Sequence, residues 1–237
     1  MDSARNTLDE KGTQALAKSY ILPFFLYLLG VGVVTALPRS MYPVAYSAVV
    51  VLVAAVTLVL LRGRRIVAPH WRVGEAIVVG LVGIVLWVGL SQLRLEDGLA
   101  AHLPSWLRPQ PRAAYNPFEQ LTQPLAIWGF VAVRLIGLVL LVPLAEELFW
   151  RGFLLRWLTS AEWEQVPLGR FTGASFLGVT LLCTLAHPEW LAAAVYCALL
   201  NGLFYWKKDL WSCIVAHGVS NLLLGLYVLL TGAWWLW

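Results

Sequence analysis

The sequence predicts an all-α membrane protein, a bundle of about seven spanning helices. Hydrophobic residues occupy 60% of its 237 positions and charged residues only 13%, whereas soluble domains hold about 45–50% apolar and about 25% charged residues. The chain also contains 13 tryptophans, a residue type that is enriched where a membrane meets water. This composition excludes a soluble globular domain. The net charge of +4 is small and gives no indication of nucleic-acid binding.

Seven apolar stretches are long enough to be expected as membrane spans, since a spanning helix needs about 20 mostly apolar residues. They are residues 19–37, 43–61, 74–93, 124–143, 171–187, 190–206 and 211–230. Residues 144–158 are expected to continue the fourth stretch as helix, with a bend near Pro143 because proline lacks a backbone N–H. No internal repeat divides the sequence. We therefore expect one membrane-embedded domain over 1–237, with a polar N-terminal segment over 1–18.

The distribution of Lys and Arg predicts the orientation in the membrane. Most basic residues outside the expected spans fall on the side that holds the N-terminus. Basic residues accumulate in cytoplasmic loops of membrane proteins. The N-terminus is therefore expected in the cytoplasm, in a multi-pass protein of a bacterial inner membrane.

Two glutamates and an arginine directly follow the fourth apolar stretch, where charge is costly. A charged side chain at the bilayer centre costs about 2.5–3.5 kcal/mol on insertion scales. Glu147 and Arg151 are four positions apart, and in this order they can form an ion pair on a helix. Glu146 points about 100° away from that pair and has no helical partner. We therefore predict that Glu146 is a general base and that Glu147 and Arg151 are structural support.

Later apolar stretches supply two histidines and an asparagine. His217 and Asn221 are four positions apart, so both can donate to one oxygen atom from the same helix face, as in an oxyanion hole. The alternative is a pair of interhelical hydrogen bonds, worth about 0.6 kcal/mol each in membranes. His187 lies near the end of its stretch, and only the presence of the other motifs makes it a predicted site residue.

Other polar or reactive residues within the apolar stretches have simpler interpretations. Arg134 is interpreted as a snorkelling or paired residue, and Asn201 as a packing residue or a residue lining a cavity. The three cysteines lie in apolar sequence without a Cys-x-x-Cys pair and are expected to be buried small residues rather than disulfides or metal ligands: Cys183, Cys197 and Cys213.

In this order, the three motifs resemble those of the CPBP family of intramembrane proteases. This family includes the type II CAAX prenyl endopeptidases and relatives associated with bacteriocin processing and self-immunity. Its pattern is Glu-Glu-x-x-x-Arg, then Phe-x-x-x-His, then His-x-x-x-Asn/Asp. The residues that match its first and last motifs are Glu146, Glu147, Arg151, His217 and Asn221. In the middle motif His187 matches, but Cys183 occupies the aromatic position. The expected catalytic core is 122–230, and the more particular resemblance is to CAAX-protease-like proteins found beside bacterial exosortase systems.

The resemblance implies a glutamate-dependent endopeptidase that needs no cofactor. Glu146 and His187 would activate a water molecule for attack on the scissile carbonyl. His217 and Asn221 would stabilise the oxyanion. The expected partners are the lipid bilayer and a protein or peptide substrate tethered to it, with no nucleic acid, and nothing in the sequence indicates that the substrate is prenylated.

Other functions remain open at this point. Glu146, His187 and His217 could instead bind zinc as a two-histidine, one-carboxylate site with a position left for water. A non-enzymatic membrane scaffold or immunity protein would be expected to lack Glu146 or His217, and both are present. A proton-relay transporter would favour an inverted repeat, which the sequence lacks. Ser220 does not lie in a rhomboid-like Gly-x-Ser-Gly sequence, which disfavours a serine protease.

Overall fold

The computed structural model describes the chain apart from residues 1, 97, 99–101, 106–107, 109–111 and 113. The described residues form helices and no strands, which confirms the all-α class. Within them, five helices are long and apolar enough to cross a membrane. These helices are Gly12–Ala36, Arg39–Leu61, Gly74–Leu93, Pro124–Trp157 and Leu210–Thr231. The expected number of seven spans is not confirmed.

The two remaining expected spans, 171–187 and 190–206, form helices that differ from the other five. Helix α9, Gly173–Leu185, has 13 residues, so it is about 20 Å long against about 30 Å of bilayer hydrocarbon. Pro188 follows closely, and a proline disfavours helix in the residue before it. Helix α10, Trp190–Lys207, has 18 residues but is less apolar than the five spans. Residues 171–187 and 190–206 are therefore not among the five helices that are long and apolar enough to cross a membrane.

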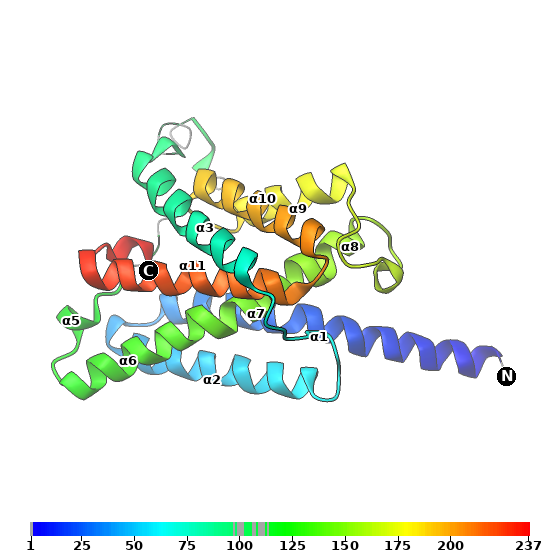
Figure 1. Ribbon diagram of the computed structural model, residues 1–237. Coiled ribbons are helices and arrows are strands. Elements are labelled where there is room, and N and C mark those ends of the chain that lie inside the picture. Colours follow the sequence, from blue (N-terminus) through cyan, green and yellow to red (C-terminus); the bar gives the residue numbers. More distant parts are fainter. Residues whose placement is uncertain (1, 97, 99–101, 106–107, 109–111, 113) are drawn as a thin grey trace.

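The helices form a bundle in which α11 lies at the centre (Figure 1). It packs against α3, α7 and α10, while α1 packs along α2. Helix α1 is continuous from Asp2, and its start extends past the other helices (Figure 1). The remaining labelled helices have these bounds: α1 Asp2–Ala36, α2 Tyr42–Leu61, α3 Gly74–Leu93, α5 Pro117–Gln120, α6 Pro124–Ile136, α7 Val142–Glu147, α8 Leu155–Trp157 and α11 Leu210–Thr231.

The long run from α6 to α8 contains two π-helical segments, Gly137–Leu141 and Leu148–Leu154. Such segments replace the usual hydrogen bond between residues four apart with one between residues five apart. The first segment lies just before Pro143, where an irregularity was expected, and the second begins directly after Glu147. Both therefore flank the short helix α7, which carries the two glutamates.

The first π-helical segment leaves a backbone carbonyl without a helical donor. The Val142 N–H donates to the Gly137 carbonyl, five residues back. Pro143 has no N–H to donate to the next carbonyl, that of Leu138. The side-chain Nδ2 of Asn221 donates to it instead, at 2.8 Å. The free carbonyl of the irregular turn is thus a hydrogen-bonding partner for α11.

Glycines allow α3 to approach its neighbours closely, as small residues do in membrane helix packing. A Cβ atom on Gly80 would lie 2.6 Å from the carbonyl oxygen of Ala216 in α11 and 2.8 Å from Cβ of Val219. A Cβ atom on Gly83 would collide with the ring of Tyr196. The hydroxyl of Ser220 donates to the Gly80 carbonyl at 2.8 Å, so a side chain of α11 is also bonded to the backbone of α3.

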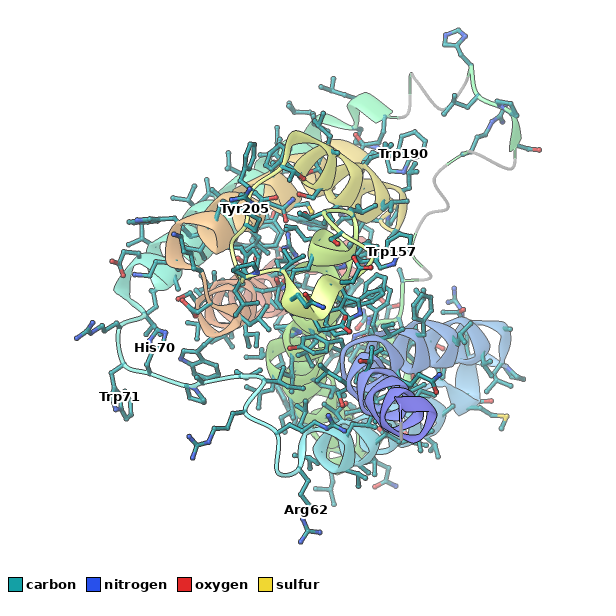
Figure 2. All side chains as sticks on the ribbon, turned by 90° about the vertical axis from the view of Figure 1, so that its right-hand side faces the viewer. Arg62, His70, Trp71, Trp157, Trp190 and Tyr205 are labelled. Atoms are coloured by element: carbon teal, nitrogen blue, oxygen red, sulfur yellow. The ribbon has the colours of Figure 1, made fainter. Side chains whose placement is uncertain are left out.

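The loop between α2 and α3 carries an exposed tryptophan and a group of arginines. Trp71 is fully exposed, and it points away from the bundle, as does Arg62 (Figure 2). The loop is held against α11 at His70, whose carbonyl accepts a hydrogen bond from Trp211 Nε1 at 3.0 Å and whose Nε2 lies 3.4 Å from Asp209 Oδ1. Its basic residues are Arg62, Arg64, Arg65 and Arg72.

The substitution Gly80→Ala is expected to destabilise the bundle by about 1–3 kcal/mol, because its methyl group overlaps the α11 backbone. Gly89→Ala on the same helix is the matched control, since no atom lies within 4 Å of its added Cβ. Thermal unfolding in one detergent measures both. Equal midpoints for the two variants would show that α3 and α11 are not as close as described.

Candidate functional site

A cavity of about 440 Å³ lies inside the helix bundle. Its walls come from α1, α2, α3, α9, α10, α11 and the run from α6 to α8. All four residues predicted to be catalytic line it: Glu146, His187, His217 and Asn221. The structure thus brings together residues from three separate motifs, while their roles stay predictions.

The ion pair predicted from the spacing of Glu147 and Arg151 is present and almost fully buried. Arg151 Nη1 donates to Glu147 Oε1 at 3.1 Å, and the two side chains are 2% and 0% exposed. The other guanidinium donors reach α10, where Nε donates to Asn201 Oδ1 at 3.0 Å and Nη2 to the Cys197 carbonyl at 3.1 Å. A buried charge pair needs such additional hydrogen bonds to offset its desolvation. Asn201 therefore has a structural role as a hydrogen-bond acceptor for Arg151.

Glu147 also binds His217, a contact that was not predicted from the sequence. His217 Nδ1 lies 2.8 Å from Glu147 Oε1. An ionised carboxylate only accepts hydrogen bonds, so Nδ1 carries the hydrogen and Nε2 is the nitrogen left for other partners. Among the described residues, no donor reaches the other carboxylate oxygen of Glu147, Oε2. Glu147 therefore joins α7 to α11 as well as to Arg151.

Glu146 has a different environment from its neighbour. Its side chain is half-buried and lines the cavity. No described residue forms a side-chain hydrogen bond or ion pair with it within bonding distance, in contrast to Glu147. The helical offset between adjacent positions places one carboxylate in the protein interior and the other at the cavity surface. Of the two adjacent glutamates, Glu146 is therefore the one whose carboxylate faces the cavity.

His187 lies in the turn after α9 and is held from two sides. Its Nδ1 is 2.8 Å from the Cys183 carbonyl; since a carbonyl only accepts, Nδ1 carries the hydrogen and Nε2 is the free nitrogen. Trp87 of α3 packs edge-on against the imidazole, with ring centroids 5.6 Å apart. Trp87 also contacts Tyr196, which in turn contacts His217. An aromatic residue from α3 thus packs against His187, and both Trp87 and Cys183 line the cavity.

Asn221 is held by the hydrogen bond from Nδ2 to the Leu138 carbonyl. A side-chain amide has two N–H donors, so one remains for the cavity. The predicted oxyanion hole thus retains a single donor from Asn221, with its orientation fixed by the π-helical segment.

The described residues contain no group of three or more His, Cys, Asp or Glu side chains arranged to hold a metal ion. Glu146, His187 and His217 line one cavity without converging on a common point as zinc ligands do. Zinc therefore stays a prediction for experiment to test.

A mostly apolar cavity inside a helix bundle, into which a carboxylate and two histidines project, is the kind of site that an intramembrane hydrolase requires. Residues 128–223 match the family model described as type II CAAX prenyl endopeptidase Rce1-like. This range includes every site residue predicted from the motifs and confirms the resemblance to the CPBP and CAAX protease family. The match does not extend to the exosortase-associated subgroup. Neither a search of curated proteins nor one of solved structures gives a match.

The two adjacent glutamates are expected to differ in their effect on stability. Glu147→Gln leaves Arg151 buried without a counter-charge and is expected to destabilise the protein by about 3–5 kcal/mol. Glu146→Gln, at the cavity surface, is its matched control and is expected to change stability by less than about 1 kcal/mol. Denaturation in detergent measures both. Similar losses for both variants would contradict the separate environments of the two side chains.

Proposed function

We propose that the protein is an intramembrane endopeptidase that hydrolyses a peptide bond in a membrane-tethered protein or peptide. The main support is Glu146, an unpaired carboxylate that lines the same cavity as His187, His217 and Asn221. The family match over 128–223 supports proteolysis independently of this geometry.

In the proposed reaction, Glu146 and His187 position and activate a water molecule. The Glu146 carboxylate and the free Nε2 of His187 are both acceptors, so they can bind the two hydrogens of one water. Glu146 takes a proton from that water as the water oxygen attacks the scissile carbonyl carbon. It then passes the proton to the nitrogen of the leaving amine, and the carboxylate is restored.

The oxyanion formed by this attack is stabilised by His217 and Asn221. Because Nδ1–H of His217 is already bound to Glu147, the ring can donate through Nε2 only as an imidazolium. The buried Glu147 carboxylate stabilises this positive charge. Asn221 adds its remaining N–H. Fixed donors in an enclosed site are effective because they need no reorganisation when the charge develops.

We further propose that the N-terminus lies in the cytoplasm, as in a multi-pass protein of a bacterial inner membrane. Two spanning helices, α1 and α2, separate the N-terminus from the arginine-rich loop 62–73, so both lie on the same side. The positive-inside rule places that side in the cytoplasm.

Glu146→Gln is expected to lower kcat by about 10²–10⁴-fold, the contribution of a general base, with folding retained. Hydrolysis of N-palmitoylated peptides in liposomes, with and without a chelator, measures this effect. Glu119→Gln, an exposed carboxylate in α5, is the control and should keep full activity. Unchanged activity in Glu146→Gln would refute the proposed mechanism, and chelator-sensitive activity restored by zinc would favour the metal alternative.

Asn221→Ala is expected to lower kcat by about 10²–10³-fold with little change in KM, because its donor acts on the oxyanion. Loss of the hydrogen bond to Leu138 should also lower stability by about 1 kcal/mol. Steady-state kinetics and thermal unfolding separate the two effects. A stability loss with normal kcat would leave Asn221 a purely structural role.

A further inference from the structure

A second cavity, of about 360 Å³, lies between α11 and the helical run that carries the two glutamates. One wall comes from the run at Val139, Leu140 and Leu144, and the other from α11 between Trp211 and Leu222. All the residues that line it are apolar, and none of them lines the cavity described above. We call this second cavity the outer groove.

The outer groove opens towards the surrounding bilayer. Leu140 and Leu222, one on each wall, are 63% and 40% exposed, and both lie in helices long and apolar enough to cross a membrane. Along α11 the groove extends from Trp211 to Leu222, eleven positions or about 17 Å of helix. The hydrocarbon of one leaflet is about 15 Å deep, half of the bilayer core. The groove therefore has the length of one lipid acyl chain within one leaflet.

The groove begins beside the loop between α2 and α3, residues 62–73. Trp211, its first residue on α11, donates through Nε1 to the His70 carbonyl at 3.0 Å. Figure 2 shows His70, Trp71 and Arg62 on one side of the bundle, with Trp71 pointing outwards. An exposed tryptophan is favoured where the membrane meets water. The loop is thus placed at the level of the lipid headgroups, at one end of the groove.

The loop presents positive charge that the protein leaves uncompensated. It has four exposed arginines, and none of them belongs to an ion pair formed by the described residues. Basic side chains at a membrane surface attract anionic lipids. A guanidinium also binds phosphate through two parallel charge-assisted hydrogen bonds. The four residues are Arg62, Arg64, Arg65 and Arg72.

We infer that the outer groove and the loop 62–73 together bind one anionic phospholipid, with its phosphate at the arginines and an acyl chain in the groove. The site is cationic at the membrane surface and apolar through the depth of one leaflet, which is the pattern of such a lipid. A second copy of this chain is disfavoured as the occupant, because its apolar helices would leave the arginines uncompensated. The inference does not depend on the proposed proteolysis.

A lipid in this position would contact both helices that position the candidate site. Leu144 precedes Glu146 by two positions, and Gly218 directly follows His217. Leu144 and Gly218 both line the groove. The bound chain would therefore stabilise the packing of the glutamate-bearing run against α11 from the side opposite the cavity.

The test measures the binding of single lipids to the delipidated full-length protein in detergent, by native mass spectrometry. The probes are dioleoyl phosphatidylglycerol, dioleoyl phosphatidylcholine and dihexanoyl phosphatidylglycerol, which keeps the anionic headgroup without long chains. Wild type is expected to bind one dioleoyl phosphatidylglycerol about 10- to 100-fold more tightly than dioleoyl phosphatidylcholine, the effect of charge-assisted hydrogen bonds. The short-chain lipid should bind at least about 100-fold more weakly than its dioleoyl form, because it buries few CH₂ groups.

Replacing the four loop arginines with glutamine should abolish the preference for the anionic lipid and retain binding of dioleoyl phosphatidylcholine, which also reports that the variant is folded. The control replaces four exposed basic residues elsewhere and should keep the preference: Lys18, Arg39, Arg170 and Lys208.

Val215→Phe fills the groove, which Val215 lines, and should weaken binding of both dioleoyl lipids about 10-fold. Val85→Phe, at a 71% exposed position on α3, is the matched control and should weaken neither. Leu222→Trp at the exposed rim replaces Val215→Phe if that variant does not fold.

Equal affinity of wild type for the two dioleoyl lipids would overturn the inference, as would a preference that persists without the four arginines. Equal weakening by Val215→Phe and Val85→Phe would show that lipid binds around the bundle and not in the groove. If Val215→Phe separated a dimer into monomers and left lipid binding unchanged, a second copy would be the occupant and the inference would fail.

Discussion

The buried ion pair between Glu147 and Arg151 is the interaction on which the rest of the site depends. Without water to solvate them, both charges require protein partners, and these partners come from α10 and α11. Three helices are thereby fixed relative to one another. The pair also sets the position of His217, and because Glu147 is engaged, Glu146 is the carboxylate left at the cavity. The structural role of Glu147 and the proposed role of Glu146 as a general base therefore both follow from the buried ion pair.

The parts of the site that could be predicted from the sequence are those governed by helical spacing. The Glu147–Arg151 pair and the separate direction of Glu146 both follow from positions one and four residues apart. The bond between Glu147 and His217 could not be predicted in this way, because it joins residues 70 positions apart. The expected number of seven spans is not confirmed, for another reason. Apolar composition indicates burial, but Pro188 and the polar end of α10 limit helices that composition alone would count as spans.

Trp87 shows that the site extends beyond the region of family similarity. It belongs to α3, outside residues 128–223, yet it forms the aromatic contact to His187. The aromatic contact to His187 is thus supplied by a helix other than α9, which carries Cys183. The close approach of α3 to α11 at Gly80 is therefore part of what shapes the cavity.

The π-helical segment at Gly137–Leu141 determines how Arg134 and Glu146 are oriented relative to one another around the helix axis. In a regular α-helix, twelve steps of about 100° would point Arg134 and Glu146 about 120° apart. A π turn takes up one residue more than an α turn, so the effective count is eleven steps and the difference falls to about 20°. A regular α turn at the same sequence length would leave the hydropathy of the span unchanged but rotate Arg134 by about 100° relative to Glu146. The shared orientation of Arg134 and Glu146 therefore depends on the one extra residue in the π turn, which the pattern of apolar residues in the sequence does not indicate.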